Sequence, residues 1–148
     1  MTKTTIGPGD WVVVCDGRKW LILENAGDER SPNLKTREER QVEDPPTHLQ
    51  GTDKPGRTYQ STGAARSAIG QTDWHDEAER AFLKDLAKRI NDAVSKRETN
   101  ALILVAPPRA LGMIRPELSP AVLKILRLEI DKDYVALPVY EIEKRILA

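Results

Sequence analysis

The clearest signal along the chain is a pair of uninterrupted apolar runs, at residues 11–15 (WVVVC) and 101–106 (ALILVA). Aliphatic and β-branched residues without polar alternation are typical of strands that are buried on both faces of a sheet. Asp16-Gly17, directly after the first run, predicts a tight hairpin turn with two positive-φ residues. Residues 19–23 (KWLIL) then predict the returning strand, so the chain begins with a β-hairpin.

Weaker patterns follow the hairpin. Residues 33–42 alternate weakly and predict an edge strand that ends before Pro45-Pro46, because proline cannot donate to a ladder. From Thr72-Asp73, which can cap a helix, apolar residues recur every three or four positions and predict a long helix. Its predicted buried stripe is Ala78, Ala81, Phe82, Leu86, Ile90, Ala93 and Val94. The charges predicted to form its solvated face are Glu79, Arg80, Lys84, Asp85, Lys88 and Arg89.

Short elements complete the chain. Pro107-Pro108 predicts the end of the second buried strand, and Ser119-Pro120 has the N-cap serine and first-turn proline of a helix. Residues 126–130 alternate as a half-buried strand should. The residues expected to face inward from a last helix, which begins at Pro138, are Val139, Ile142 and Ile146.

The resulting order, β-β-β-loop-α-β-α-β-α, predicts an α/β fold. It describes a single domain over residues 1–148, with a mixed β-sheet, flanking helices and a long protruding loop. That loop spans about residues 44–72 and closes a polar stretch that begins near Ser31. Loops longer than about 12–15 residues are usually either functional or disordered, and the pattern alone leaves both open.

Composition limits the functional classes. Twenty-three basic and 23 acidic residues cancel, so any affinity for nucleic acid or membrane must come from a local patch. The sequence shows no signal-peptide pattern and no 18-residue apolar segment, which predicts a cytoplasmic protein without membrane insertion. A single cysteine, Cys15, excludes an internal disulfide, and its place in a buried strand predicts an inert thiol.

The predicted loop has a modest basic patch. Between residues 47 and 72, Lys54, Arg57 and Arg66 outnumber Asp53, and Tyr59 is available for stacking on a base. Such an arm suits RNA or a ribosome-linked partner, and it would also suit a groove on a protein. Its glycine, serine and threonine content is equally that of plain disorder.

Arg109 is a further candidate for binding. It lies in the segment 106–112 (APPRALG), after the second buried strand, where ligands of open α/β sheets bind. Its guanidinium could hold a phosphate or a carboxylate. The structural alternative is that the prolines only end the strand and that Gly112 permits a tight turn.

A second candidate set would serve a small hydrolase or a metal-dependent enzyme. Its members are Asp73, His75, Asp76 and Glu79. The structural alternative is that His75 packs on Trp74 or caps the helix, because one histidine among carboxylates is common by chance. The sequence has no P-loop, dinucleotide fingerprint, Gly-x-Ser-x-Gly motif or paired metal histidines, so no metal and no cofactor is predicted.

Several ordered segments resemble the bacterial host attachment protein family, which is described as required for attachment to host cells. They are WVVVCDGRKWLIL, GTDKPGR, TDWHDEAERAFLKDLAKRIN, LILVAPPRALGMIRPELSP and EIDKDY, which together cover nearly the whole chain. The order of elements is similar to the middle domain of archaeal and eukaryotic class-1 translation release factors. In that domain a hairpin of the form DG precedes a long loop with a Gly-Gly-Gln tip, then Ser-Ala-Leu, a long charged helix and a buried strand.

The resemblance implies a scaffold without the catalytic tip. Ala64-Ala65-Arg66 stands in the place of Gly-Gly-Gln, and Ser67-Ala68-Ile69 in the place of Ser-Ala-Leu. Alanine accepts positive φ only at a cost of about 1 kcal/mol or more, and an arginine side chain cannot accept a hydrogen bond from water. The predicted function is therefore non-catalytic binding of RNA or a ribosome-linked partner through residues 47–72. A protein-binding factor in host-cell attachment is a further alternative.

Overall fold

The computed structural model describes residues 4–42 and 57–147, with side chains described for residues 4–42 and 76–147. The strands are β1 (Trp11–Cys15), β2 (Lys19–Asn25), β3 (Leu34–Gln41), β4 (Leu102–Val105) and β5 (Leu126–Ile130). The helices are α2 (Arg57–Ser95), α3 (Pro108–Ile114), the 3-10 turn η2 (Arg115–Glu117), α4 (Pro120–Ile125) and α5 (Val139–Leu147).

The strands form one mixed sheet in the order β3-β2-β1-β4-β5. β1 pairs with β2, and β2 with β3, in antiparallel ladders, because short connections return the chain directly. β4 pairs in parallel with both β1 and β5, because helical crossovers precede and follow it. The predicted α/β fold with a mixed sheet and flanking helices is confirmed.

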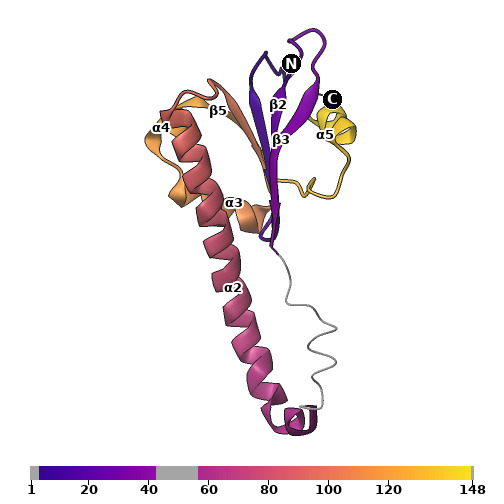
Figure 1. Ribbon diagram of the computed structural model, residues 1–148, viewed down its shortest axis with the longest axis vertical. Coiled ribbons are helices and arrows are strands. Elements are labelled where there is room, and N and C mark those ends of the chain that lie inside the picture. Colours follow the sequence, from indigo (N-terminus) through magenta and orange to yellow (C-terminus); the bar gives the residue numbers. More distant parts are fainter. Residues whose placement is uncertain (1–3, 43–56, 148) are drawn as a thin grey trace.

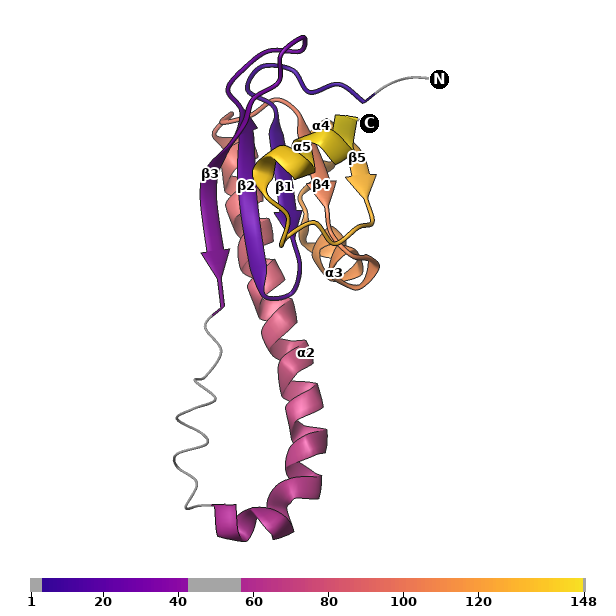
Figure 2. The same cartoon turned by 90° about the vertical axis from the view of Figure 1, so that its right-hand side faces the viewer.

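Helices cover both faces of the sheet, and two apolar clusters fill the spaces between them. α2, α3 and α4 lie on one face and α5 on the other (Figure 1, Figure 2). Alternate residues of β1 serve the two clusters, with Trp11 and Val13 facing α2 and with Val12 and Val14 facing α5. All of β1 and β4 is buried, as the two apolar runs predict.

α2 is longer than the sheet and begins earlier than the sequence predicts. It has 39 residues, bends near its N-terminal end and projects beyond the sheet (Figure 1, Figure 2). The predicted start at Thr72 is therefore wrong, since residues 57–72 of the expected loop are helical. Alanine and arginine, at positions 64–66 and 68, favour a helix. The rest of the predicted loop, residues 44–56, lies outside the described residues.

The buried face of α2 also differs in detail from its predicted stripe. Leu83 is fully buried and Ala87 nearly so, although neither belongs to the prediction, and Ala81 is exposed. Phe82, Leu86, Ile90 and Ala93 are buried as predicted. We call residues 57–75 of α2, which precede this packed part, the arm.

Two predicted turns have other conformations. Positive φ among the described residues occurs at Gly9 and Arg97, so the Asp16-Gly17 turn does not use it. The Asp16 carboxylate instead accepts hydrogen bonds from the backbone N–H groups of Arg18 and Lys19, both at 2.8 Å. Gly112 lies inside α3 and not in a turn, because Pro108 at the first helical position starts a helix directly after β4.

Asn25 joins the β2–β3 connection to the segment before β1. Its side chain is 2% exposed, and its amide makes five hydrogen bonds. The Nδ2 group donates to the carbonyls of Ile6, Gly7 and Asp28, and Oδ1 accepts from the N–H groups of Gly27 and Asn33. This side chain therefore satisfies backbone groups that a turn alone would leave without partners.

We predict that Asn25→Ala lowers the free energy of unfolding by about 3 kcal/mol, because it leaves several buried backbone groups unpaired. Equilibrium unfolding in urea measures the loss. Asn33→Ala is the matched control, since Asn33 is exposed and bonds here through its backbone. An equal loss in both variants would contradict a special role for Asn25.

Candidate functional site

The point where α2 leaves the sheet brings together residues from three elements. Arg109, at the start of α3, donates from Nε to Glu79 Oε1 of α2 at 3.0 Å. Its second guanidinium nitrogen pairs with the Asp76 carboxylate, one turn earlier on α2. We call Asp76, Glu79, Arg109 and the adjoining Gly17 the arm base. It lies where the packed part of α2 ends.

Gly17 gives the arm base its close packing. A Cβ atom at this position would lie 2.7 Å from Glu79 Cγ and 2.8 Å from Glu79 Cδ. Since Arg109 also binds the Glu79 carboxylate, Glu79 contacts both the β1–β2 turn and α3. Glycine is needed at the Asp16-Gly17 turn for this approach and not for its backbone angles.

The charges of the arm base sum to −1, from two carboxylates and one guanidinium. The hydrogen bonds that Arg109 donates to Glu79 and then to Asp76 raise the pKa of Arg109. The sequence predicts two separate candidate sites, an anion site at Arg109 and a carboxylate set that includes Asp76 and Glu79. In the structure these three residues contact one another. The described side chains include no group of three or more histidine, cysteine, aspartate or glutamate residues able to hold a metal ion.

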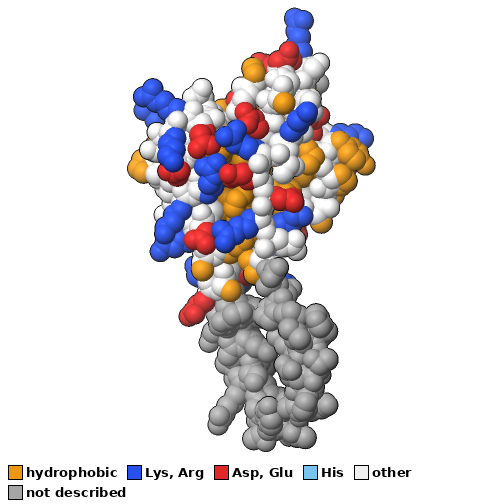
Figure 3. All heavy atoms as spheres, in the orientation of Figure 1, with side chains coloured by type: hydrophobic (Ala, Val, Ile, Leu, Met, Phe, Trp, Pro, Cys, Tyr) orange, Lys and Arg blue, Asp and Glu red, His pale blue; other side chains and the backbone are white. Residues whose placement is uncertain are grey.

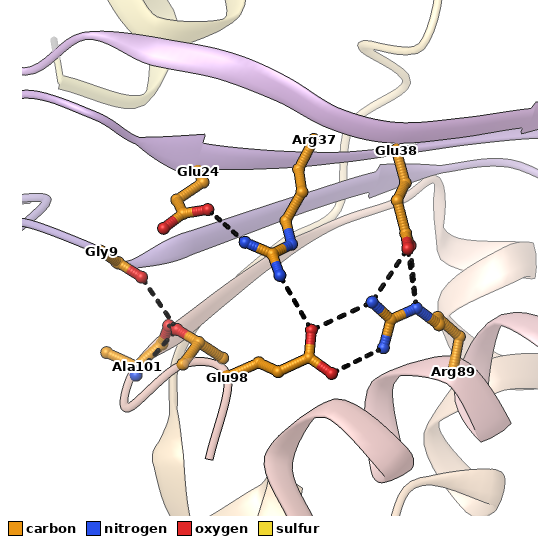
Figure 4. A network of polar contacts seen from close by, with 8 residues as sticks. Gly9, Glu24, Arg37, Glu38, Arg89, Glu98 and Ala101 are labelled. Carbon is orange, nitrogen blue, oxygen red and sulfur yellow. Dashed lines mark hydrogen bonds and ion pairs between the residues drawn. The ribbon is translucent and has the colours of Figure 1, made fainter. Parts of the chain in front are cut away.

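A second polar cluster fastens the packed part of α2 to the edge of the sheet (Figure 4). Arg89 of α2 donates from Nε to both carboxylate oxygens of Glu38 on β3, at 3.0 and 2.9 Å. Its other nitrogens reach Glu98, which follows α2, at 3.1 and 3.3 Å. Arg37 of β3 bridges Glu98 at 3.0 Å and Glu24 of β2 at 2.7 Å. Sequence reasoning missed this cluster except for Arg89.

The two guanidinium groups of this cluster also cover the ring of Trp11. Arg37 lies 5.1 Å and Arg89 5.7 Å from the ring centroid, within the range of a cation–π interaction. Trp11 is fully buried, and the two guanidinium groups cover its apolar ring with polar atoms. The hydrogen bonds that Arg89 donates to Glu38 and to Glu98 raise the pKa of Arg89. The Arg89 and Arg37 guanidinium groups lower the pKa of Glu98.

The sequence of the whole domain carries a family signature. Residues 10–146 match the model of Bacterial archaeo-eukaryotic release factor family 12. The chain belongs to this family. The match covers the sheet, all of α2 and nearly all of α5, and it supports the release-factor part of the resemblance described above. A host-attachment role stays a prediction.

The chain is also similar to a protein of Rickettsia prowazekii (strain Madrid E). The uncharacterized protein RP470 is 35% identical to the chain over 74 residues. That stretch is 50% of this chain and 48% of RP470, so the chain matches about half the length of this relative.

The remaining predicted site residues are Lys54 and five residues of the arm. Lys54 is outside the described residues. Arg57, Tyr59, Arg66, Asp73 and His75 belong to α2 by their backbone, and their side chains are outside the described set. Their roles stay predictions.

Two further features of this release-factor family chain concern the core and the helices. Burial and then the neighbouring Asp16 raise the pKa of the Cys15 thiol to about 12, and the predicted burial of Cys15 is confirmed. None of the helices in the described ranges combines the length and apolar character that crossing a bilayer requires.

We predict that the Glu98 carboxylate stabilises the folded release-factor domain at neutral pH. Because its folded-state pKa is lowered from the ordinary 4.5, this contribution is present above that value and is lost as the pH falls through the folded-state pKa. Glu98→Gln should lower the melting temperature at pH 7 and reduce the further drop on acidification to pH 3. Thermal melts by circular dichroism measure both effects.

Glu29→Gln is the control for Glu98, since Glu29 is exposed between β2 and β3 and has no ion pair within the described part of the chain. Its melts should follow the wild type at both pH values. An acid-induced drop of unchanged size in Glu98→Gln would show that the polar cluster is not the source of acid sensitivity.

Proposed function

We propose that this chain is a non-catalytic binding member of its release-factor family that contacts RNA, on the ribosome or in a ribosome-linked complex, through residues 47–72. The observation that carries the proposal is the arm. α2 continues for several turns beyond its packed part, which extends from Phe82 to Ala93 (Figure 2). A helix that projects from a domain without packing on it contributes to binding more readily than to stability.

The polar contacts at the sheet support this role. The arm base and the Arg89 cluster hold α2 at two levels, about one turn below and two turns above Phe82. A helix fixed at two levels presents its free end in a defined direction, which lowers the ordering cost of binding. The geometry suits presentation of a segment to a large partner.

The sequence of the arm supports binding over hydrolysis. Ala64-Ala65-Arg66 lacks the glycines and the glutamine of the release-factor tip, and all three residues are in helical backbone. An arginine side chain has donors only, so it cannot accept a hydrogen bond from a water nucleophile. The arm base does not support the hydrolase alternative, because the Asp76 and Glu79 carboxylates that it would use already pair with Arg109.

Electrostatics favours RNA as the partner. The whole chain has no net charge, whereas residues 47–72 have a net charge of about +2 from three basic residues and one acid. An arm of this charge contributes phosphate contacts, and Tyr59 could stack on a base. In this proposal the protein acts in the cytoplasm, and any effect on host attachment would follow from its binding partner.

We predict that changing Lys54, Arg57 and Arg66 together to alanine weakens RNA binding without altering the melting temperature. Losing about three phosphate contacts should flatten the dependence of log affinity on log salt by roughly 2 units. Sedimentation with purified ribosomes and anisotropy with a fluorescent oligouridylate, each as a salt series, measure the change. The matched control changes Arg30, Lys132 and Lys144, exposed basic residues away from α2, to alanine.

Affinity that survives the arm substitutions at every salt concentration would overturn the role of residues 47–72. Capture of a protein partner that is insensitive to nuclease, with no binding to either RNA probe, would favour the host-attachment alternative.

A separate prediction concerns catalysis. The purified protein should not release peptide from ribosome-bound peptidyl-tRNA above the rate in buffer, because Ala64-Ala65-Arg66 stands in the place of the Gly-Gly-Gln tip whose glutamine helps to place the water. The measurement is release of labelled peptide, with a Gly-Gly-Gln release factor as the positive control. Release that disappears in Arg66→Ala would contradict a non-catalytic protein.

A further inference from the structure

The charged residues of α2 separate into two sets in the structure. Glu79 and Arg89, both predicted to be solvated, pair with Arg109 and with Glu38 and Glu98. Arg80, Lys84 and Lys88 remain exposed, and within the described part of the chain none of the three has an ion pair or side-chain hydrogen bond. We call these three residues the basic stripe.

The spacing of the basic stripe places three like charges in a row. Residues four apart lie on one face of a helix, about 6 Å apart along its axis. Like charges at this spacing destabilise a helix, so the arrangement has a cost that opposite charges would avoid. Figure 3 shows Lys and Arg side chains along the flank of the molecule over α2, interspersed with Asp and Glu side chains.

Two of the acids next to the stripe along α2 are committed elsewhere. Asp76, four residues before Arg80, pairs with Arg109. Asp92, four residues after Lys88, pairs with Lys96 at 3.1 Å. Glu77, three residues before Arg80, and Asp85, three residues before Lys88, lie exposed beside the stripe, and these two carboxylates leave the five residues with a charge of +1. The fold thus leaves a net positive strip along α2.

The surroundings of the stripe indicate the class of partner. The large apolar side chains exposed on the described surface are Val42, Leu123 and Tyr140, and none of them is on α2. A protein interface needs an apolar or aromatic anchor at its centre, whereas a nucleic-acid backbone is bound by charge alone. We infer that Arg80, Lys84 and Lys88 contact successive phosphates of an RNA strand that the arm engages. This inference rests on the proposed RNA-binding function.

The stripe extends the proposed binding surface from the arm onto the packed part of α2. Both lie on one continuous helix, so a strand bound at the arm can follow α2 past the arm base (Figure 1). The stripe adds contacts that do not depend on base identity, because phosphates carry no sequence information.

The test is the triple variant Arg80→Gln, Lys84→Gln and Lys88→Gln in the full chain, with a fluorescent oligouridylate as probe. Three lost phosphate contacts should flatten the plot of log affinity against log salt by about 2 units. Between about 50 and 200 mM salt, the wild-type affinity should therefore fall roughly 20-fold more than that of the variant. The melting temperature should stay equal or rise, because repulsion between like charges is removed.

The control variant changes Arg30, Lys132 and Lys144 to glutamine, which alters the net charge equally at exposed positions away from α2. It should keep the wild-type slope. An unchanged slope in the stripe variant, together with a reduced slope in the arm variant, would overturn this inference and leave the proposed function standing. The reverse result would support the stripe and overturn binding through residues 47–72. A wild-type protein that binds neither the probe nor ribosomes would overturn both.

Discussion

The packing of α2 against the sheet depends on how one aromatic ring is covered. Trp11 is fully buried at the start of the central strand β1, beneath the guanidinium groups of Arg37 and Arg89. Each arginine contributes the hydrocarbon of its stem to the apolar surface and its charge to neighbouring carboxylates. A neutral side chain over Trp11 would leave Glu38 and Glu98 without partners. The ring, the two cations and the acids therefore form one cooperative unit that orients the longest helix.

The sheet and most of its helices could be predicted because their signals are local. Uninterrupted apolar runs identify β1 and β4, and Ser119-Pro120 identifies the start of α4. The start of α2 could not be found in this way. An amphipathic pattern arises only where a helix packs on something, and the arm has no such pattern because it projects beyond the sheet. Threonine and glycine near residues 58–63 hide the helix further.

The candidate site was accessible to sequence reasoning only in parts. Arg109, Asp76 and Glu79 each stood out by residue type and position, but their contact joins residues 30 and 33 positions apart. The Arg89–Glu38 and Arg37–Glu98 pairs span 51 and 61 positions. Pattern analysis detects spacings within one helix or strand, and a contact between elements depends on how the strands are ordered. The mixed order β3-β2-β1-β4-β5 decides these contacts, and the residues themselves do not encode it locally.

Because α2 is one continuous helix, any change in its length also rotates the part of the helix beyond the change. Adding one residue between the arm and the arm base would rotate everything beyond it by about 100° and advance it by about 1.5 Å. Adding seven would restore nearly the same orientation, while the tip would move outward by about 10 Å. Insertions can therefore lengthen the arm and keep its orientation only in steps of about seven residues, which is close to two helical turns. A smaller change would turn the tip away from whatever surface it meets.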